Sequence, residues 1–196
     1  GVGKRLSQYL KNRKIEKIKD ILLNLPYSET DRSKLVDLDK LEIGKIQTIK
    51  VIVKKLNFPR IRNLPNKIFC EDKTGKIEVV YFNSREGYLR KLFPINKWVI
   101  ISGKIGFFKN KYQITNPDYT VPINKENFVN KLMPKYSLTE GLTEKVYNKL
   151  INQVLENIIE IPEWHNNEVL KKIGNVSWHN AILEIHKKKE NLLNSK

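Results

Sequence analysis

The chain has 196 residues, of which 40% are hydrophobic, and this is enough for one compact domain with helical attachments. Its 37 basic and 21 acidic residues give a net charge of +16, which predicts a polyanionic partner. The basic residues are 30 Lys and 7 Arg, a bias that an AT-rich genome would also produce, so part of the charge can reflect base composition. No segment has the length of a membrane span or the plan of a signal peptide, and the single cysteine, Cys70, excludes an internal disulfide and a cysteine metal cluster, as fits a reducing cytoplasm.

Residues 1–43 are predicted to form an N-terminal helical segment and a connection. Leucines four positions apart indicate a first helix, and after a break near Asn12 a second apolar stripe runs to Pro26, which stops it. Beyond Pro26 we expect an irregular connection in which Asp31 and Arg32 are free to pair locally. The chain begins without a methionine, and we expect it to be a piece of a longer protein.

Residues 44–123 are predicted to form a small barrel. A short helix, capped by Ser84 and stopped by Pro94, is expected between the third and fourth strands, and Lys109-Asn110-Lys111 is expected to turn the last hairpin. The five predicted strands cover residues 45–56, 67–72, 76–83, 97–106 and 112–121. Three strands, a helix and two strands are typical of an OB-fold, which commonly binds single-stranded nucleic acid. The predicted fold class is therefore α+β: a five-stranded OB-fold β-barrel with an inserted short helix, flanked by N-terminal and C-terminal helical segments.

The third predicted strand carries the most informative pattern. It follows the turn Asp72-Lys73-Thr74-Gly75, in which Gly75 is expected to supply the conformational freedom that reverses the chain. Period-two alternation then places Ile77, Val79 and Tyr81 on the core face and Glu78, Val80 and Phe82 on the other. We therefore expect the Phe82 ring to lie outside the barrel, where it can meet a nucleic-acid base.

Residues 124–196 are predicted to form a C-terminal helical linker. Thr143 is expected to cap a long helix whose apolar residues recur every four positions, and Pro162 is expected to end it. A second capped helix is expected to begin at Ser177.

The sequence lacks the residue patterns of an enzyme. It contains no G-x-x-x-x-G-K-[ST] phosphate loop, so the chain alone is not expected to hydrolyse ATP. His165, His179 and His186 are too scattered to predict a zinc site, and Cys70 is expected to be a small buried core residue. We therefore expect neither a catalytic nor a metal site, no cofactor in this chain, and a role in binding.

Three clusters combine cations with flat side chains, as binding of single-stranded nucleic acid requires. The first cluster, at the first hairpin, contains Lys54, Lys55, Phe58, Arg60, Arg62 and Lys67. The second, at the end of the third strand and in the inserted helix, contains Phe82, Arg85, Tyr88 and Arg90. The third, at the last hairpin, contains Phe107, Phe108, Lys109, Lys111 and Tyr112.

Each cluster also has a purely structural interpretation. The aromatic rings of the third cluster could plug the mouth of the barrel. Lys54 and Lys55 could protect an edge strand against aggregation. Tyr88 could pack the inserted helix onto the barrel, and that helix could cover Phe82.

Several motifs in the chain resemble the N-terminal wedge region of RecG, the bacterial ATP-dependent helicase of branched DNA. They lie in the family's order and span nearly the whole chain: GVGK at 1–4, DILLNLPY at 20–27 leading to DR at 31–32, DKTG at 72–75, YFN at 81–83, NPDY at 116–119, PKYSLTEGL at 134–142, IPEW at 161–164 and AILEIH at 181–186. The chain departs from the family in PYSETDR at 26–32, which lacks the family's paired arginines, and in Lys187, which stands where a proline is usual.

The resemblance implies a branched-DNA-binding wedge that acts at replication forks or Holliday junctions in DNA repair and recombination. It implies that Phe82 and Tyr88 match the rings that stack on unpaired bases, with nearby cations holding the template strands. ATP and Mg²⁺ are expected only for helicase motor domains of the same protein, beyond residue 196. We expect a monomer in the bacterial cytoplasm, with branched DNA of single-stranded character and its own C-terminal motor domains as partners, and no membrane.

Two other classes of function also fit the sequence. An RNA-binding OB module, of the kind attached to tRNA synthetases, would share the barrel and the charge but not the flanking helices. A protein-docking adaptor would use the helices, and its charge would reflect only base composition.

Overall fold

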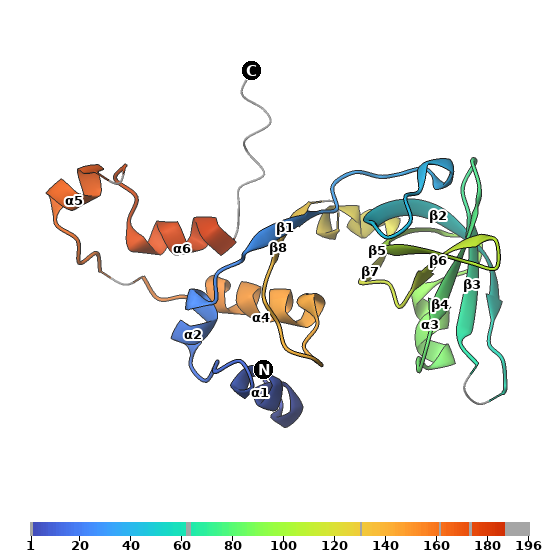
Figure 1. Cartoon of the computed structure of the whole chain (residues 1–196), viewed down its shortest axis with the longest axis horizontal. Coiled ribbons are helices and arrows are strands. Elements are labelled where there is room, and N and C mark those ends of the chain that lie inside the picture. The colour runs from blue at the N-terminus through green and yellow to red at the C-terminus, as the bar shows by residue number, and fades with distance from the viewer. Residues whose placement is uncertain (1, 62–63, 130, 161, 173, 187–196) are drawn as a thin grey trace, which may run out of the picture. The chain divides into compact units, whose positions relative to one another are not determined.

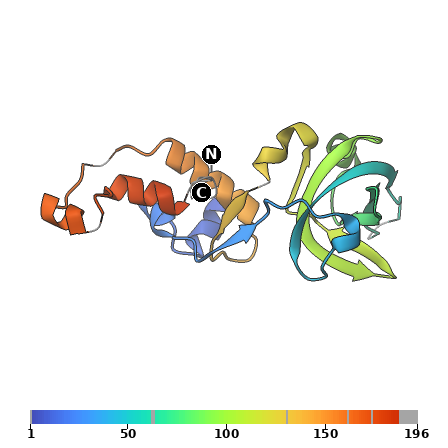
Figure 2. The same ribbon diagram turned by 90° about the horizontal axis from the view of Figure 1, so that it is seen from above.

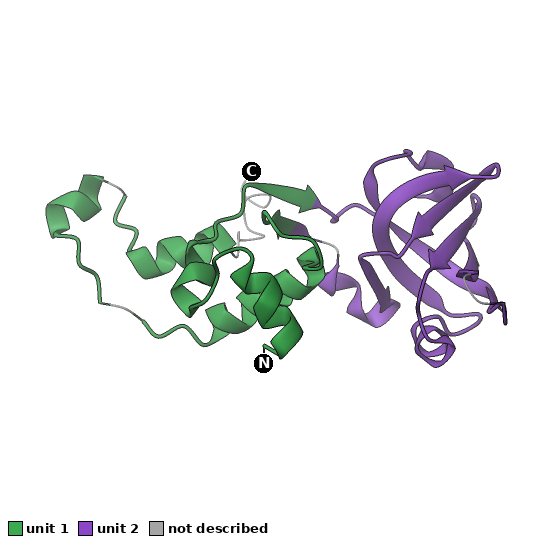
Figure 3. Ribbon diagram, turned by 60° about the horizontal axis from the view of Figure 1, so that its bottom comes forward, with its two compact units in different colours: residues 1–30, 133–196 green, residues 31–132 purple. Residues whose placement is uncertain are grey.

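A computed structural model describes residues 2–61, 64–129, 131–160, 162–172 and 174–186 of the chain. They belong to two compact units, one formed by residues 1–30 and 133–196 and the other by residues 31–132 (Figure 3). The range 44–123 predicted for the barrel lies inside the second unit, whereas the first unit draws on both ends of the chain.

The second unit is an OB-fold barrel, as predicted. Its elements are η1 (Leu38–Lys40), β2 (Ile46–Asn57), β3 (Asn66–Glu71), β4 (Lys76–Tyr81), α3 (Glu86–Leu92), β5 (Trp98–Phe108), β6 (Lys111–Thr115), β7 (Tyr119–Pro122) and η2 (Ile123–Phe128). The strand order is β2-β3-β4-β6-β5-β7, and because β2 also pairs with β5, the first five close into a barrel that curves around its core (Figures 1 and 2). The described ladders between these strands are antiparallel except β4–β6.

Two details of the barrel differ from the sequence-based prediction. The predicted fifth strand is divided into β6 and β7, because the backbone at Asn116 is left-handed, with φ of 45°, and Pro117 follows it. The inserted helix begins at Glu86 with Arg85 as its extended N-cap, so Ser84 is not the cap. Leu89 and Phe93 are completely buried, and they attach this helix to the barrel core.

Both predicted turns exist, although one depends on a different property of glycine. Lys109 and Asn110 form a two-residue hairpin turn with φ of 49° and 59°, as a type I′ turn requires. At the Asp72 turn, one carboxylate oxygen of Asp72 accepts hydrogen bonds from the backbone N–H groups of Thr74 and Gly75. Gly75 has no left-handed backbone there; a Cβ at this position would lie 3.2 Å from the Leu38 Cβ, so close approach explains the glycine.

The first unit is helical. Its helices are α1 (Lys4–Lys11), α2 (Ile18–Leu23), α4 (Glu144–Glu156), α5 (Asn167–Lys172) and α6 (Trp178–His186) (Figure 1). The paired strands β1 (Ser28–Asp31) and β8 (Leu132–Lys135) each belong to this unit except for Asp31 and Leu132. The break at Asn12 and the caps are confirmed: the Thr143 hydroxyl accepts from the Val146 N–H, and the Ser177 hydroxyl from the Asn180 N–H. The predicted long helix ends at Glu156 rather than at Pro162, and β1, β8 and α5 were not predicted.

A polar chain of contacts runs through the core of this unit. The Tyr136 hydroxyl lies 2.9 Å from Nδ1 of His186, and Nε2 of His186 lies 2.8 Å from the Leu22 carbonyl oxygen. Nε2–H donates to that carbonyl, and in a neutral imidazole Nδ1 then accepts from the tyrosine hydroxyl. Burial lowers the pKa of His186, in agreement with that neutral state.

Candidate nucleic-acid interface

The end of β4 presents an aromatic ring outside the barrel. Ile77, Val79 and Tyr81 are buried in the core, as the alternation predicts, whereas the side chain of Phe82 is 47% exposed. The inserted helix therefore does not cover it. An aromatic face that remains accessible at the end of an OB-fold strand can stack on a base.

The rest of this outer face is less open than expected, because Glu78 is engaged by two cations. Its carboxylate oxygens lie 3.0 Å from the ammonium groups of Lys67, on β3, and Lys111, on β6. Partial burial opposes ionisation of Glu78, but these two hydrogen-bonded lysines outweigh it and hold the pKa of Glu78 below its ordinary value. The Glu78 carboxylate thus links Lys67 of the first hairpin to Lys111 of the last hairpin.

The second predicted cluster connects to the first through α3. The Arg90 guanidinium binds Glu86 at 2.7 Å and lies over the Phe58 ring, 5.0 Å from its centroid. Tyr88 is 54% exposed, so it does not pack α3 onto the barrel, and Arg85 is exposed at the N-cap. The Tyr88 ring is therefore available for contact with a ligand, as the Phe82 ring is.

Cations of the first cluster lie along β2 and the loop that follows it. Lys54 pairs with Glu71 at 3.1 Å, while Lys55 and Arg60 are exposed. Phe58 is partly buried against the core. Arg62 lies outside the described residues.

The third cluster divides between core and surface. Tyr112 packs against the barrel core and meets the Phe107 ring edge-on, with 5.3 Å between centroids. Phe107 and Phe108 nevertheless keep about half of their surface exposed, and the Lys109 ammonium lies 5.6 Å from the Phe108 centroid. A plug role fits Tyr112, and the two phenylalanines present accessible faces beside a cation.

Two contacts of the NPDY motif at residues 116–119 were not predicted. The Phe82 N–H donates to Oδ1 of Asn116 at 3.1 Å. Arg32 is 1% exposed and lies 2.7 Å from both the Asp118 carboxylate and the Ser102 hydroxyl, so the prediction that Asp31 and Arg32 pair locally is wrong. Both contacts involve the NPDY motif at residues 116–119, whose order Asn-Pro-Asp marks a rigid turn.

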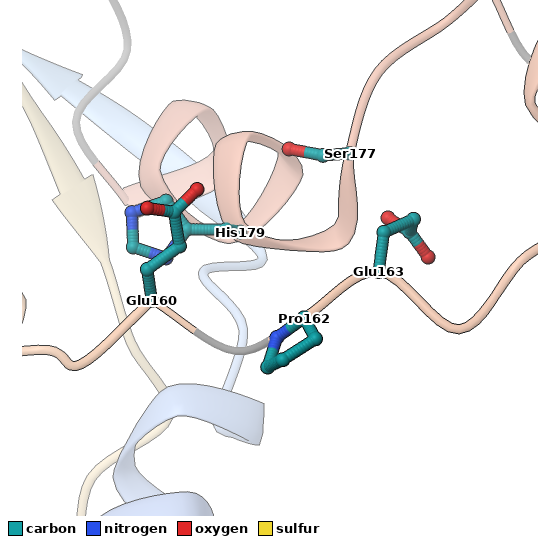
Figure 4. Close-up of a pocket in the computed structure, with 5 residues that line it drawn as sticks. All are labelled: Glu160, Pro162, Glu163, Ser177 and His179. Carbon is teal, nitrogen blue, oxygen red and sulfur yellow. The ribbon is translucent and has the colours of Figure 1, made fainter.

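Other polar sites do not provide an alternative chemistry. Cys70 is buried, which confirms it as a core residue, and this burial raises the pKa of its thiol to about 12. A pocket of about 290 Å³ in the helical unit is lined by Glu160, Pro162, Glu163, Ser177 and His179 (Figure 4). Its Glu163 already accepts the N–H of Trp178, and hydrogen bonds from the His165 and Trp178 N–H groups lower its pKa to about 2.

Within the described parts of the chain, no three His, Cys, Asp or Glu side chains come together as a metal site, and no helix has the length and apolar character to cross a membrane. The same parts contain a second hollow, an apolar groove of about 600 Å³ between α2 and α4 that Trp178 also lines. The groove is in the helical unit, apart from the clusters described above.

The family model and the similar proteins all point to the same family. The model of the RecG wedge domain matches residues 1–160. The ATP-dependent DNA helicase RecG of Haemophilus influenzae is 29% identical over 157 residues, which cover 79% of this chain and 22% of that protein. RecG of Borreliella burgdorferi is 26% identical over 198 residues, covering 95% of this chain and 28% of that protein.

The fold has a solved counterpart. The structure of RecG bound to a three-way DNA junction matches with a TM-score of 0.73 and 22% identity, covering 95% of this chain and 26% of that one. At 22% identity this likeness shows the fold of the chain. The chain spans about a quarter of the length of these relatives.

Proposed function

The chain belongs to the RecG wedge domain family, and from this premise we propose that it binds branched DNA, such as a replication fork or a Holliday junction, as the wedge of a RecG-like helicase in DNA repair and recombination. Relatives named ATP-dependent DNA helicases and a RecG structure bound to a three-way junction support the proposal. ATP hydrolysis with Mg²⁺ would belong to motor domains of the same protein, because this chain contains no phosphate loop. We place it in the bacterial cytoplasm, acting as a monomer.

The observation that carries the proposal is the exposed Phe82 ring. A phenylalanine at the end of a barrel strand gains no core packing by remaining 47% exposed, yet its face is available to an unpaired base. Exposed cations, Lys55 and Arg60, lie on the same barrel and can contact phosphates beside a stacked base. Tyr88, Phe107 and Phe108 are further candidates for stacking.

The test compares two exposed phenylalanines of the same unit. Phe82→Ala should weaken binding of a labelled three-way junction by about 1–3 kcal/mol, or about 5- to 150-fold in Kd. The matched control is Phe128→Ala, because Phe128 is 67% exposed on η2 and belongs to none of the three clusters. Melting temperatures of both variants should stay close to the parent, since neither change leaves an internal cavity.

A large drop in melting temperature with unchanged affinity in the folded fraction would remove Phe82 from the interface. Equal losses of affinity for Phe82→Ala and Phe128→Ala would show that the effect is not local to β4.

The two rival functions give different results in the same titration. An RNA-binding module would prefer tRNA to the junction when the two compete. An adaptor would bind both weakly and without preference for a branch, and its partner protein would occupy the apolar groove beside α2 and α4. The exposed ring and cations speak against the adaptor, and membership of the RecG wedge family favours the junction over RNA.

A further inference from the structure

The short parallel ladder between β4 and β6 stops just before Phe82. Its register pairs Glu78 with Gln113, Val79 with Ile114 and Val80 with Thr115. The next backbone bond, from the Asn116 N–H to the Val80 carbonyl, is still made at 2.8 Å. At Asn116, however, the backbone becomes left-handed and the chain turns away from β4.

The Asn116 side chain replaces the ladder bond that this turn removes. Its Oδ1 accepts the Phe82 N–H at 3.1 Å, as a backbone carbonyl of a continuing strand would. Asparagine suits the position twice, because it tolerates a left-handed backbone and its amide mimics a peptide group. Asn116 therefore ends β6, and its side chain adds one more hydrogen bond to the chain that follows β4, at Phe82.

The turn that carries this amide is itself fixed. Pro117 restricts the backbone directly after Asn116. Asp118 is held at 2.7 Å by the buried Arg32, whose guanidinium also lies over the Tyr119 ring, 5.1 Å from its centroid. The turn that carries the acceptor of Phe82 is thus anchored to the barrel through Asp118, Arg32 and Ser102.

Phe82 needs such a hold, because it lies one residue beyond β4 and is followed by Asn83, whose φ is 55°. An exposed ring on a loosely held backbone must be ordered when a base stacks on it, which weakens binding. We propose that Asn116 is a positioning residue for DNA binding, which holds the Phe82 backbone so that its ring is oriented for stacking before DNA arrives. This inference rests on the proposed function.

A double-mutant cycle tests it. Asn116→Gly removes the amide but keeps the left-handed backbone without strain. We expect it to raise the Kd for the three-way junction about three- to tenfold when Phe82 is present, which is the effect of losing one hydrogen bond. In a Phe82→Ala background the same change should raise the Kd less than twofold, because the residue through which it acts is gone.

Two further measurements separate positioning from general support of the fold. In a junction with 2-aminopurine at the branch, saturating Asn116→Gly protein should quench the fluorescence less than the parent does. Asn116→Asp retains an acceptor oxygen, and we expect it to bind as well as the matched charge control Asn83→Asp, which adds the same charge beside Phe82.

The outcomes distinguish a failure of the positioning role of Asn116 from a failure of the proposed DNA-binding function. If Phe82→Ala binds the junction as tightly as the parent, the stacking role in the proposed function fails. If Phe82→Ala weakens binding but Asn116→Gly alone does not, the function stands and the positioning role is overturned. Equal losses for Asn116→Gly in both backgrounds, or unchanged quenching at saturation, also overturn it.

Discussion

Replacing Arg32 should destabilise the barrel more than any change at its surface. Its guanidinium is 1% exposed and makes two short hydrogen bonds, to Ser102 and Asp118. Removing one partner of a buried charged pair costs about 3–5 kcal/mol. The Asp118 side chain is 45% exposed and can be hydrated once it is alone, and the Ser102 hydroxyl keeps its bond to Thr48. We therefore expect the lower end, about 3 kcal/mol, for Arg32→Ala.

The barrel offers its own reporter for this measurement. Of the three tryptophans, only Trp98 belongs to residues 31–132, so a Trp164→Phe/Trp178→Phe background makes fluorescence specific to the barrel. A unit of roughly 100 residues loses about 4–8 °C in melting temperature per kcal/mol, which predicts a drop of about 12–24 °C for Arg32→Ala.

Arg32→Lys keeps the charge but cannot reach both partners in the same fork geometry, so we expect a smaller loss, about 1–2 kcal/mol. Arg60→Ala, at an exposed arginine, is the matched control and should stay within about 0.5 kcal/mol of the parent. A free energy of unfolding for Arg32→Ala within about 1 kcal/mol of the parent would refute the reasoning, because the buried pair would then contribute nothing.

Three further predictions concern charge, packing and pH. If the interface neutralises about 5 phosphates, the log–log salt dependence of junction binding should have a slope near −4 to −5, and replacing Arg60 and Arg62 by Ala should flatten it; an unchanged slope would exclude the first hairpin. Gly141→Ala should lower the unfolding free energy of the helical unit by about 1–3 kcal/mol in urea titrations, because φ is 85° and a Cβ would lie 2.5 Å from the Tyr9 ring; a neutral effect would contradict this packing. Because burial lowers the pKa of His186, the unfolded chain binds more protons, so stability should be full above pH of about 6.5 and fall below it, and His186→Phe should weaken this pH dependence in melting experiments.

The sequence predicted the barrel well because its signals are local. The inward placement of Ile77, Val79 and Tyr81 and the turn at Lys109 and Asn110 depend on neighbouring residues, and both are present as expected. The opposite face of β4 differs from the prediction, because Glu78 and Val80 are buried as well. Phe82 is exposed as expected, although Val80 on the same predicted face is only 4% exposed. Such features can be inferred without knowing which distant segment lies beside them.

The errors arose where a distant partner decides the structure. Arg32 is held by Ser102 and Asp118, 70 and 86 positions along the chain, and no local pattern indicates this. The last predicted strand divides because Asn116 adopts a left-handed backbone, which the following proline alone did not reveal. Glu78 was expected on an open face, but lysines from two other strands cover it.

The helical unit has a consequence for how the protein is made. Its core joins residues near the start of the chain, such as Leu10 and Leu22, to Tyr136 and Tyr147. About 110 residues separate these groups, so at about 5–20 residues per second the ribosome needs roughly 5–20 s to supply the partners. During that interval residues 31–132 are complete and can fold, while the apolar stripes of α1 and α2 remain uncovered. The apolar residues of α1 and α2 are therefore buried later than the core of the barrel, and molecular chaperones would find a binding site on them during synthesis.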